Sequence, residues 1–341
     1  MAETPTAPAV PSHIPPPPPM PGEESRAAVA PLISFQHVSR WYGQIIGLND
    51  VSCEVGPGLT ALLGPNGAGK STFIRLVTGQ LRPTTGRALV LGESPFANAR
   101  VLGRLGYCPE IDNFYEEMTG REFVTQLAAM SGFSGRDLKE RVDRSIERVG
   151  MSDRCDRKVG GYSKGMRQRI KVAQAILHDP QVLVLDEPLN GLDPVGRLEM
   201  TALMSALARE GRCVLVSSHI LYEVEQLTDN ILLMQRGRLL ARGSVRDIRD
   251  LMDRDTQTPR HIVLRVDRPR AMAADLLGVP SVMGVRFDPQ YPGRLEVETR
   301  DPRAFFASLP DVVLAGDYGV ESVDSPDDHL ESILRNLLNR K

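Results

Sequence analysis

The chain has 341 residues, of which 41% are hydrophobic and 25% charged, an ordinary composition for a globular protein and enough for one large and one smaller domain. Lysines and arginines number 41 against 43 aspartates and glutamates, so charge gives no reason to expect nucleic-acid binding. No apolar run approaches the roughly 18 residues that cross a bilayer. The N-terminal residues lack the basic segment followed by an apolar one that is typical of a signal peptide, so no signal peptide is predicted.

Proline dominates the first 31 residues. Ten of the 26 prolines precede Leu32, and five are consecutive at Pro15–Pro19. Proline lacks a backbone donor and fixes φ, so this stretch cannot form a helix or a central strand. Residues 1–31 are therefore predicted to be a disordered proline-rich tail. The alternative interpretation is a docking site for a proline-binding domain.

An α/β pattern follows and predicts one domain over residues 32–254. Short apolar runs predict buried strands at Leu59–Leu63, Val182–Leu185 and Cys213–Val216. Helices are predicted at Ser71–Val77, after the capping box Thr119/Glu122, at Gly135–Val149, and from Asp193-Pro194, where aspartate is the N-cap. A hairpin is predicted from the runs Ile231–Met234 and Arg238–Ala241.

A second pattern begins after a polar link at Arg254–Arg260 and predicts an accessory domain over residues 255–341. Its strands are expected at His261–Val266, Val282–Phe287, Arg294–Thr299 and Val312–Ala315. Its helices are expected at Ala271–Leu277, Arg303–Leu309 and Asp327–Leu338. The order β-α-β-β-α-β predicts a small α+β domain of ferredoxin-like topology.

A glycine-rich loop lies between the first predicted strand and the helix that follows it. It fits the phosphate-binding pattern GxxxxGK[ST] with Gly64, Pro65, Asn66, Gly67, Ala68, Gly69, Lys70 and Ser71, and Thr72 comes next. The glycines let backbone N–H groups turn toward an anion, and the helix N-terminus adds partial positive charge. Lys70 is expected to reach the β- and γ-phosphates of ATP, and the Ser71 hydroxyl to ligate Mg²⁺.

Two carboxylates end the buried strand Val182–Leu185. Asp186 and Glu187 follow it directly, at the edge where open α/β sheets place their ligands. Asp186 is expected to hold Mg²⁺, and Glu187 to polarise the attacking water as general base.

With the phosphate loop and the paired carboxylates in this order, the sequence resembles the nucleotide-binding subunit of ABC transporters over about Leu32–Arg249. The resemblance implies a P-loop NTPase fold of ABC type, with Tyr42 stacking on adenine and His219, in Ser217-Ser218-His219, contacting the γ-phosphate and holding Glu187. The family signature corresponds to Tyr162-Ser163-Lys164-Gly165-Met166, in which Tyr162, Lys164 and Met166 depart from the LSGGQ pattern. The D-loop corresponds to Asn190-Gly191-Leu192-Asp193.

One further departure concerns the Q-loop, Tyr107-Cys108-Pro109-Glu110, where Glu110 replaces the usual glutamine. A carboxylate still offers an oxygen to Mg²⁺ or water, but its charge near the γ-phosphate is expected either to slow hydrolysis or to alter coupling. Together with the signature, Glu110 resembles the exporter branch that handles drugs, lipids, polysaccharides or sodium.

The resemblance implies an ATPase that powers a separate membrane permease and lies at the inner face of the cell membrane through it. Ser163, Lys164, Gly165 and Met166 are expected to cap the ATP of a second subunit, so a homodimer or a paired ATPase subunit is implied, with Asp193 at its interface. A helical subdomain at about 118–157 is expected to receive the permease. Two alternatives stay open: a soluble ABC-type ATPase of translation or repair, and a module whose C-terminal domain senses a ligand while ATP only regulates.

Overall fold

The computed structural model describes residues 30–244, 247, 259–289 and 291–324. The predicted tail up to residue 29, most of the polar link and the helix predicted at Asp327–Leu338 lie outside the described residues. No helix within these ranges is long and apolar enough to cross a membrane.

The strands of the larger described segment are β1 Ile33–Tyr42, β2 Ile45–Val55, β3 Gly58–Leu63, β4 Thr85–Val90, β5 Leu105–Cys108, β6 Val182–Leu185, β7 Cys213–Ser218, β8 Ile231–Gln235 and β9 Arg238–Gly243. Its helices are α1 Lys70–Val77, α2 Ala99–Leu102, α3 Gly120–Met130, α4 Gly135–Arg148, the short 3-10 helix η2 Val159–Gly161, α5 Lys164–Ile176, α6 Pro194–Arg209 and α7 Leu221–Leu227. The three predicted buried strands and the predicted hairpin are confirmed, as are the helices at 71–77 and 135–149.

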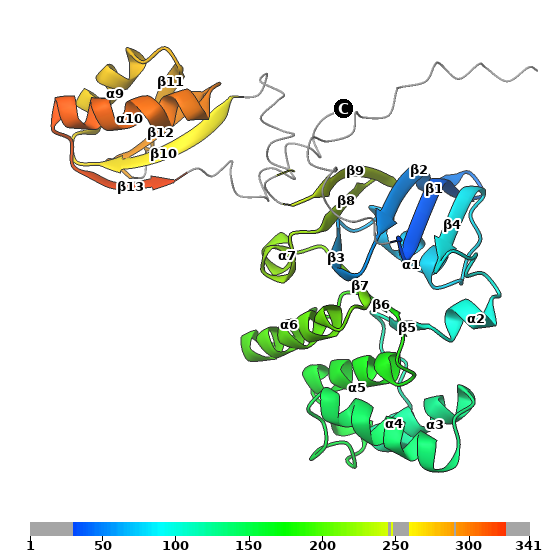
Figure 1. The fold of residues 1–341 in the computed structure, drawn as a ribbon. Coiled ribbons are helices and arrows are strands. Elements are labelled where there is room, and N and C mark those ends of the chain that lie inside the picture. Colours follow the sequence, from blue (N-terminus) through cyan, green and yellow to red (C-terminus); the bar gives the residue numbers. More distant parts are fainter. Residues whose placement is uncertain (1–29, 245–246, 248–258, 290, 325–341) are drawn as a thin grey trace, which may run out of the picture. The chain divides into compact units, whose positions relative to one another are not determined.

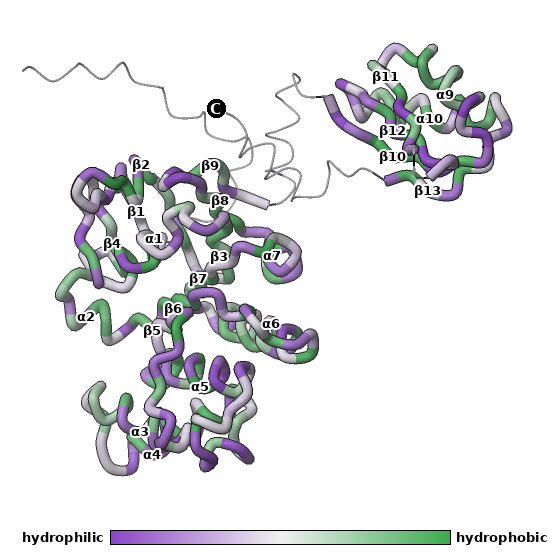
Figure 2. Tube along the Cα trace, turned by 180° about the vertical axis from the view of Figure 1, so that it is seen from behind, coloured by the Kyte–Doolittle hydropathy of each residue, from purple (hydrophilic) through white to green (hydrophobic). Residues whose placement is uncertain are grey.

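A six-stranded sheet in the order β5-β6-β7-β3-β8-β9 forms the centre of this segment, and only β9 runs antiparallel to its neighbour (Figure 1). Strand β6 is apolar at every position (Figure 2) because both of its faces are buried. Val182 and Val184 pack in one core with residues of α1, whereas Leu183 and Leu185 pack in another with residues of α5 and α6. The helices therefore cover opposite faces of the sheet.

Two further layers complete this part of the molecule. A second sheet, in the antiparallel order β2-β1-β4, is tied to α1 by the stacked rings of Phe35 and Phe73, whose centroids are 4.2 Å apart. Helices α3, α4 and α5 pack on one another. The capping box of α3 is confirmed, because the Glu122 amide donates to the Thr119 hydroxyl at 3.1 Å and the Thr119 amide donates to the Glu122 carboxylate at 2.8 Å.

The second described segment, considered by itself, holds β10 Arg260–Val266, α9 Pro269–Leu277, β11 Val282–Phe287, β12 Arg294–Thr299, α10 Pro302–Gly316 and β13 Val320–Asp324. Its sheet has the order β11-β12-β10-β13 with antiparallel neighbours. The element order β-α-β-β-α-β agrees with the prediction. Alternate residues of β10 and β12, such as Ile262, Leu264, Leu295 and Val297, enter its core.

The strand predicted at Val312–Ala315 is wrong. These residues form the last turns of α10, which continues past Pro310 and ends where Asp317 adopts the left-handed conformation, φ 48°. A run of four apolar residues fits a helix turn as well as a strand. The last strand is instead β13, which pairs with β10 from Val263 to Val266.

Candidate functional site

A cavity of about 500 Å³ opens where the ends of β3, β6 and β7 meet the N-terminus of α1. It is lined by Tyr42, Ile45, Ile46, Gly47, Pro65, Asn66, Gly67, Ala68, Gly69, Lys70, Ser71, Thr72, Glu110, Asp186, Glu187, Asn190 and His219. Six predicted segments therefore meet in one place: Tyr42, the phosphate loop, Glu110, the paired carboxylates, Asn190 of the D-loop and the candidate switch histidine. Ser163, Lys164, Gly165, Met166 and Asp193 are not part of this lining in the single chain.

The conformation of the phosphate loop requires glycine. Gly69 has φ 105°, a region that favours glycine, and a side chain there would place its Cβ 2.7 Å from the carbonyl oxygen of Gly47. A Cβ on Gly64 would collide with the Met234 carbonyl. Gly69 also caps α1 without offering a side-chain acceptor, which leaves the first amides of the helix available to an anion.

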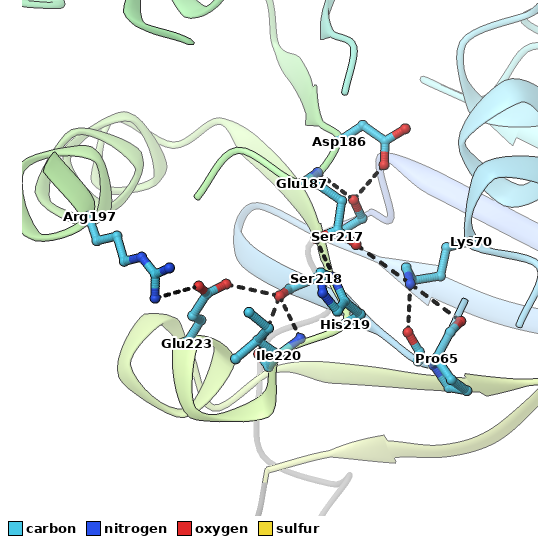
Figure 3. Close-up of polar contacts among 11 residues, drawn as sticks. Pro65, Lys70, Asp186, Glu187, Arg197, Ser217, Ser218, His219, Ile220 and Glu223 are labelled. Atoms are coloured by element: carbon cyan, nitrogen blue, oxygen red, sulfur yellow. Dashed lines mark hydrogen bonds and ion pairs between the residues drawn. The ribbon is translucent and has the colours of Figure 1, made fainter. Parts of the chain in front are cut away.

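Lys70 begins α1 and is buried at the floor of the cavity. Its ammonium donates to the carbonyl oxygens of Gly64, at 2.6 Å, and Pro65, at 3.4 Å. It also lies 3.6 Å from the Glu187 carboxylate (Figure 3). The cation thus stands between the loop that would bind phosphate and the carboxylate that would act on water.

The two carboxylates are fixed by Ser217, the next-to-last residue of β7. The Ser217 hydroxyl donates to Asp186 Oδ1 at 2.6 Å and accepts from the Glu187 amide at 2.8 Å (Figure 3). This bridge forms because β6 and β7 are parallel neighbours with Leu185 opposite Val216. The sequence interpretation quoted Ser217 only as part of the histidine motif and gave it no role. The available signal was a hydroxyl directly after the predicted strand Cys213–Val216.

His219 approaches Glu187 from the end of β7. Its Nδ1 lies 2.9 Å from Glu187 Oε2 (Figure 3). Glu187 itself has φ 48°, a left-handed conformation that is uncommon for a residue with a side chain. Such strain persists where surrounding contacts over-determine it, and it is concentrated at functional sites. Contacts with Ser217, His219 and Lys70 help to hold Glu187 here.

Burial raises the pKa of both acids. Desolvation is the largest cause for Asp186 and for Glu187. Hydrogen bonds from Ser217 to Asp186 and from His219 to Glu187 oppose it, as does the charge of Lys70, whereas the charge of Glu110 adds to it. A carboxylate whose proton affinity is increased in a cleft is suited to accept a proton.

Tyr42 ends β1 at the rim of the cavity and is 37% exposed. Its hydroxyl lies 3.4 Å from the Thr72 hydroxyl, and the Arg40 guanidinium lies 5.1 Å from the centre of its ring. An exposed ring at the mouth of the cavity is available for stacking on a flat ligand.

Glu110 lies on the segment after β5 and lines the cavity, and the sequence interpretation missed what holds it there. Lys171 of α5 is 4% exposed. Its ammonium donates to the carbonyl oxygens of Pro109, at 3.0 Å, and Glu110, at 2.9 Å, and pairs with Asp112 at 2.7 Å. Because α5 begins at the signature, Lys171 ties the signature helix to the Q-loop. Nothing in its local sequence distinguishes it from a solvent-exposed lysine.

The signature and the D-loop lie against each other in the same chain. Ser163 is the N-cap of α5 and accepts from the Met166 amide at 3.3 Å. The Lys164 side chain lies over Gly191, and a Cβ on Gly165 would lie 3.6 Å from the Leu192 side chain. Asp193 caps α6, as predicted, by accepting from the Gly196 amide at 3.2 Å.

Comparisons with known proteins identify the family of this chain. The family model described as ABC transporter matches residues 48–190. The bacitracin transport ATP-binding protein of Bacillus licheniformis is 38% identical over 212 residues, which cover 61% of this chain and 68% of that protein. The Nod factor export ATP-binding protein I of a Rhizobium species is 36% identical over 214 residues, 62% of this chain and 70% of that protein.

A solved structure of the ATP-binding subunit of an ABC transporter superposes with a TM-score of 0.59 at 31% identity, and the match covers 65% of this chain and 93% of that one. The fold of the larger described segment agrees with that structure. The chain belongs to the family of ABC transporter ATP-binding subunits, ATPases that power transport through a membrane permease.

Proposed function

We propose that this chain drives an exporter and that Glu187 is the general base of its ATPase site. The observation that carries this proposal is the position of the Glu187 carboxylate, 2.9 Å from His219 and 3.6 Å from Lys70 at the wall of the cavity. The carboxylate accepts a proton from the attacking water, and the His219 ring keeps it oriented. The names of the two relatives, bacitracin transport and Nod factor export, support the exporter assignment.

ATP is held by the phosphate loop and by Tyr42. Backbone N–H groups of residues 64–72 surround the phosphates, and Lys70 neutralises the β- and γ-phosphate charge. Tyr42 stacks on the adenine, which contributes ~1–3 kcal/mol. These groups fix the γ-phosphate in front of Glu187, so that hydrolysis depends on positioning rather than on a covalent intermediate.

Mg²⁺ fits the oxygens that line the same cavity. Ser71, Asp186 and Glu110 all line it, and the oxygens of such side chains are the hard ligands that Mg²⁺ prefers. The ion would supply charge neutralisation at the phosphates. The Ser217 hydroxyl donates a hydrogen bond to Asp186 Oδ1 at 2.6 Å. This contact orients the carboxylate with or without a bound metal ion.

Two copies of the chain, or this chain and a paired ATPase subunit, form the complete site. The signature residues Ser163, Lys164, Gly165 and Met166 lie outside the cavity of their own chain, and we propose that they cap the ATP of the other subunit. Asp193 lies at this interface. Residues 118–157 receive the permease, which keeps the subunit at the inner face of the membrane, and residues 255–341 form a separate accessory domain.

Purification from detergent-solubilised membranes tests the exporter proposal. A tagged chain is expected to bring down a polytopic membrane protein, and cell fractionation is expected to place it with membranes. Association with ribosomes or DNA in place of membranes would favour the soluble ABC-type ATPase of translation or repair.

Replacing Glu110 with glutamine tests the charge beside the γ-phosphate. Glu110→Gln removes a negative charge that adds to the raised pKa of Asp186 and Glu187, so ATP is expected to bind more tightly or to be hydrolysed faster. Lys171 contacts the backbone carbonyl of residue 110, so the substitution should leave the loop in place. Equal ATP affinity and equal basal hydrolysis, with a change only in permease-stimulated turnover, would assign Glu110 to coupling instead.

The pH profile of hydrolysis tests Glu187 as base. The base must be ionised, and burial raises the pKa of Glu187, so its proton is retained to a higher pH than in an ordinary glutamate. We expect kcat/KM for ATP to fall on acidification with an apparent pKa above the usual glutamate range. The residual activity of Glu187→Gln should lack this decline; if the decline persists there, it belongs to another group.

A further inference from the structure

One buried carboxylate, Glu223, lies outside the ATP cavity. Glu223 lies in the first turn of α7, is 6% exposed and does not line the cavity. Its Oε1 has no hydrogen-bond partner among the described residues, but it lies 3.1 Å from the Arg197 guanidinium of α6. Burying a charge is unfavourable unless it is paired, and Arg197 supplies the cation that pairs with Glu223.

Arg197 also contacts the D-loop. Its Nε donates to the carbonyl oxygen of Leu192 at 3.1 Å, and Leu192 immediately precedes the Asp193 cap of α6. One planar guanidinium therefore contacts the D-loop backbone with one nitrogen and Glu223 with another. Because the fork of an arginine is rigid, a shift of Leu192 alters both contacts together.

The other oxygen of Glu223 reaches the residues that flank His219. Glu223 Oε2 accepts from the Ser218 hydroxyl at 3.2 Å, and the same hydroxyl accepts from the Ile220 amide at 3.0 Å (Figure 3). Ser218 and Ile220 are the neighbours of His219 on either side, so this ring of contacts fixes the backbone that carries the imidazole. The imidazole in turn lies 2.9 Å from Glu187.

We propose that Arg197 and Glu223 are positioning residues for hydrolysis, which couple the D-loop to the switch histidine. The path runs from the Leu192 carbonyl through Arg197, Glu223 and Ser218 to His219. The proposal rests on the roles of Glu187 and His219 proposed above. If the D-loop lies at the subunit interface, closure of a dimer sets the position of Leu192 and, through this path, the alignment of His219 with Glu187.

The test uses the full chain and two single variants, Arg197→Met and Glu223→Gln, together with the double variant. His219→Ala provides the reference for loss of the switch. Glu210→Gln is the matched control, because Glu210 forms ion pairs with Arg148 and Arg212 at the opposite end of α6. For each variant, kcat, ATP affinity and melting temperature are measured.

Each single variant is expected to lower kcat roughly 10- to 100-fold, the range for misplacing a catalytic group by about 1 Å, while ATP affinity stays unchanged. Arg197→Met should also lower the melting temperature, because it leaves Glu223 buried without a cation. The double variant removes both charges and should recover the melting temperature but not kcat. In a His219→Ala background, Arg197→Met should have no further effect on single-turnover hydrolysis, since it acts through His219.

If the double variant recovers both kcat and melting temperature, Arg197 and Glu223 stabilise the fold but do not position His219. Wild-type kcat in the single variants would also overturn the proposal, as would an additive effect of Arg197→Met in the His219→Ala background. Wild-type kcat in His219→Ala has a different meaning, because it would remove the proposed role of His219 itself. Glu210→Gln is expected to match the wild type in kcat, which separates this path from a general loss of charge on α6.

Discussion

Glu187→Gln is expected to bind ATP and to hydrolyse it at least ~100-fold more slowly than the wild type, because a general base contributes ~10²–10⁴ to the rate. The amide can still meet His219, whose Nδ1 lies 2.9 Å from the Glu187 carboxylate. The melting temperature should not fall at neutral pH. Burial raises the pKa of Glu187, so its ionised form lowers the free energy of unfolding above that pKa, and the neutral amide removes this penalty.

The same variant tests the two-subunit site. ATP that is bound but not hydrolysed should hold two copies of the chain together, since a ligand stabilises the state that binds it. Glu187→Gln is therefore expected to sediment as a dimer with ATP and as a monomer with ADP. A monomer at saturating ATP would contradict the proposed sandwich of two isolated subunits, and hydrolysis at the wild-type rate would contradict the role of Glu187.

Adding Ser163→Arg to Glu187→Gln should abolish the ATP-dependent dimer by placing a bulky charge against the opposite nucleotide. Ser163 also caps α5 through the Met166 amide, so part of any loss comes from the cap, which contributes ~0.5–2 kcal/mol. Ser163→Ala in the same background is the matched control, because it removes the cap without adding bulk. A dimer that survives Ser163→Arg would place the signature away from the interface.

Lys70→Ala is the second substitution with a large expected effect. Losing a charge-assisted contact to phosphate should weaken ATP binding by ~1.5–3 kcal/mol, which corresponds to roughly 10- to 150-fold in Kd. Lys70→Met is the companion variant, because it retains most of the volume of a side chain that is buried and packed under the loop. Calorimetry measures the affinity, and circular dichroism checks the fold.

The control for Lys70 is Lys158→Met. Lys158 is an exposed lysine that pairs with Glu117 at 2.6 Å, and its loss should leave ATP affinity unchanged. If both Lys70 variants fold and bind ATP as the wild type does, the loop at residues 64–72 is not the phosphate site. If affinity falls for Lys70→Ala but not for Lys70→Met, packing under the loop, and not the ammonium charge, maintains the site.

The sequence by itself determined the features that lie within one short segment. The phosphate loop, the strand ending at Asp186 and Glu187, the capping box at Thr119 and the cap at Asp193 each need only residues a few positions apart. Each follows from a local requirement of the backbone. Residue 69 needs glycine because its φ is 105°, and the first amides of a helix need an acceptor. A strand that is buried on both faces needs an apolar run.

Only the tertiary structure decided which distant residues complete the site. Ser217 meets Asp186 across neighbouring strands, Lys171 reaches the Q-loop from more than 60 positions away, and Arg197 meets Glu223 between two helices. In the sequence each is one polar residue among many, because ion pairs and hydrogen bonds depend on position in space and burial, which local pattern does not encode. The same reason explains the error at Val312–Ala315: apolar residues were recognised correctly, but pairing with β10 went to Val320–Asp324.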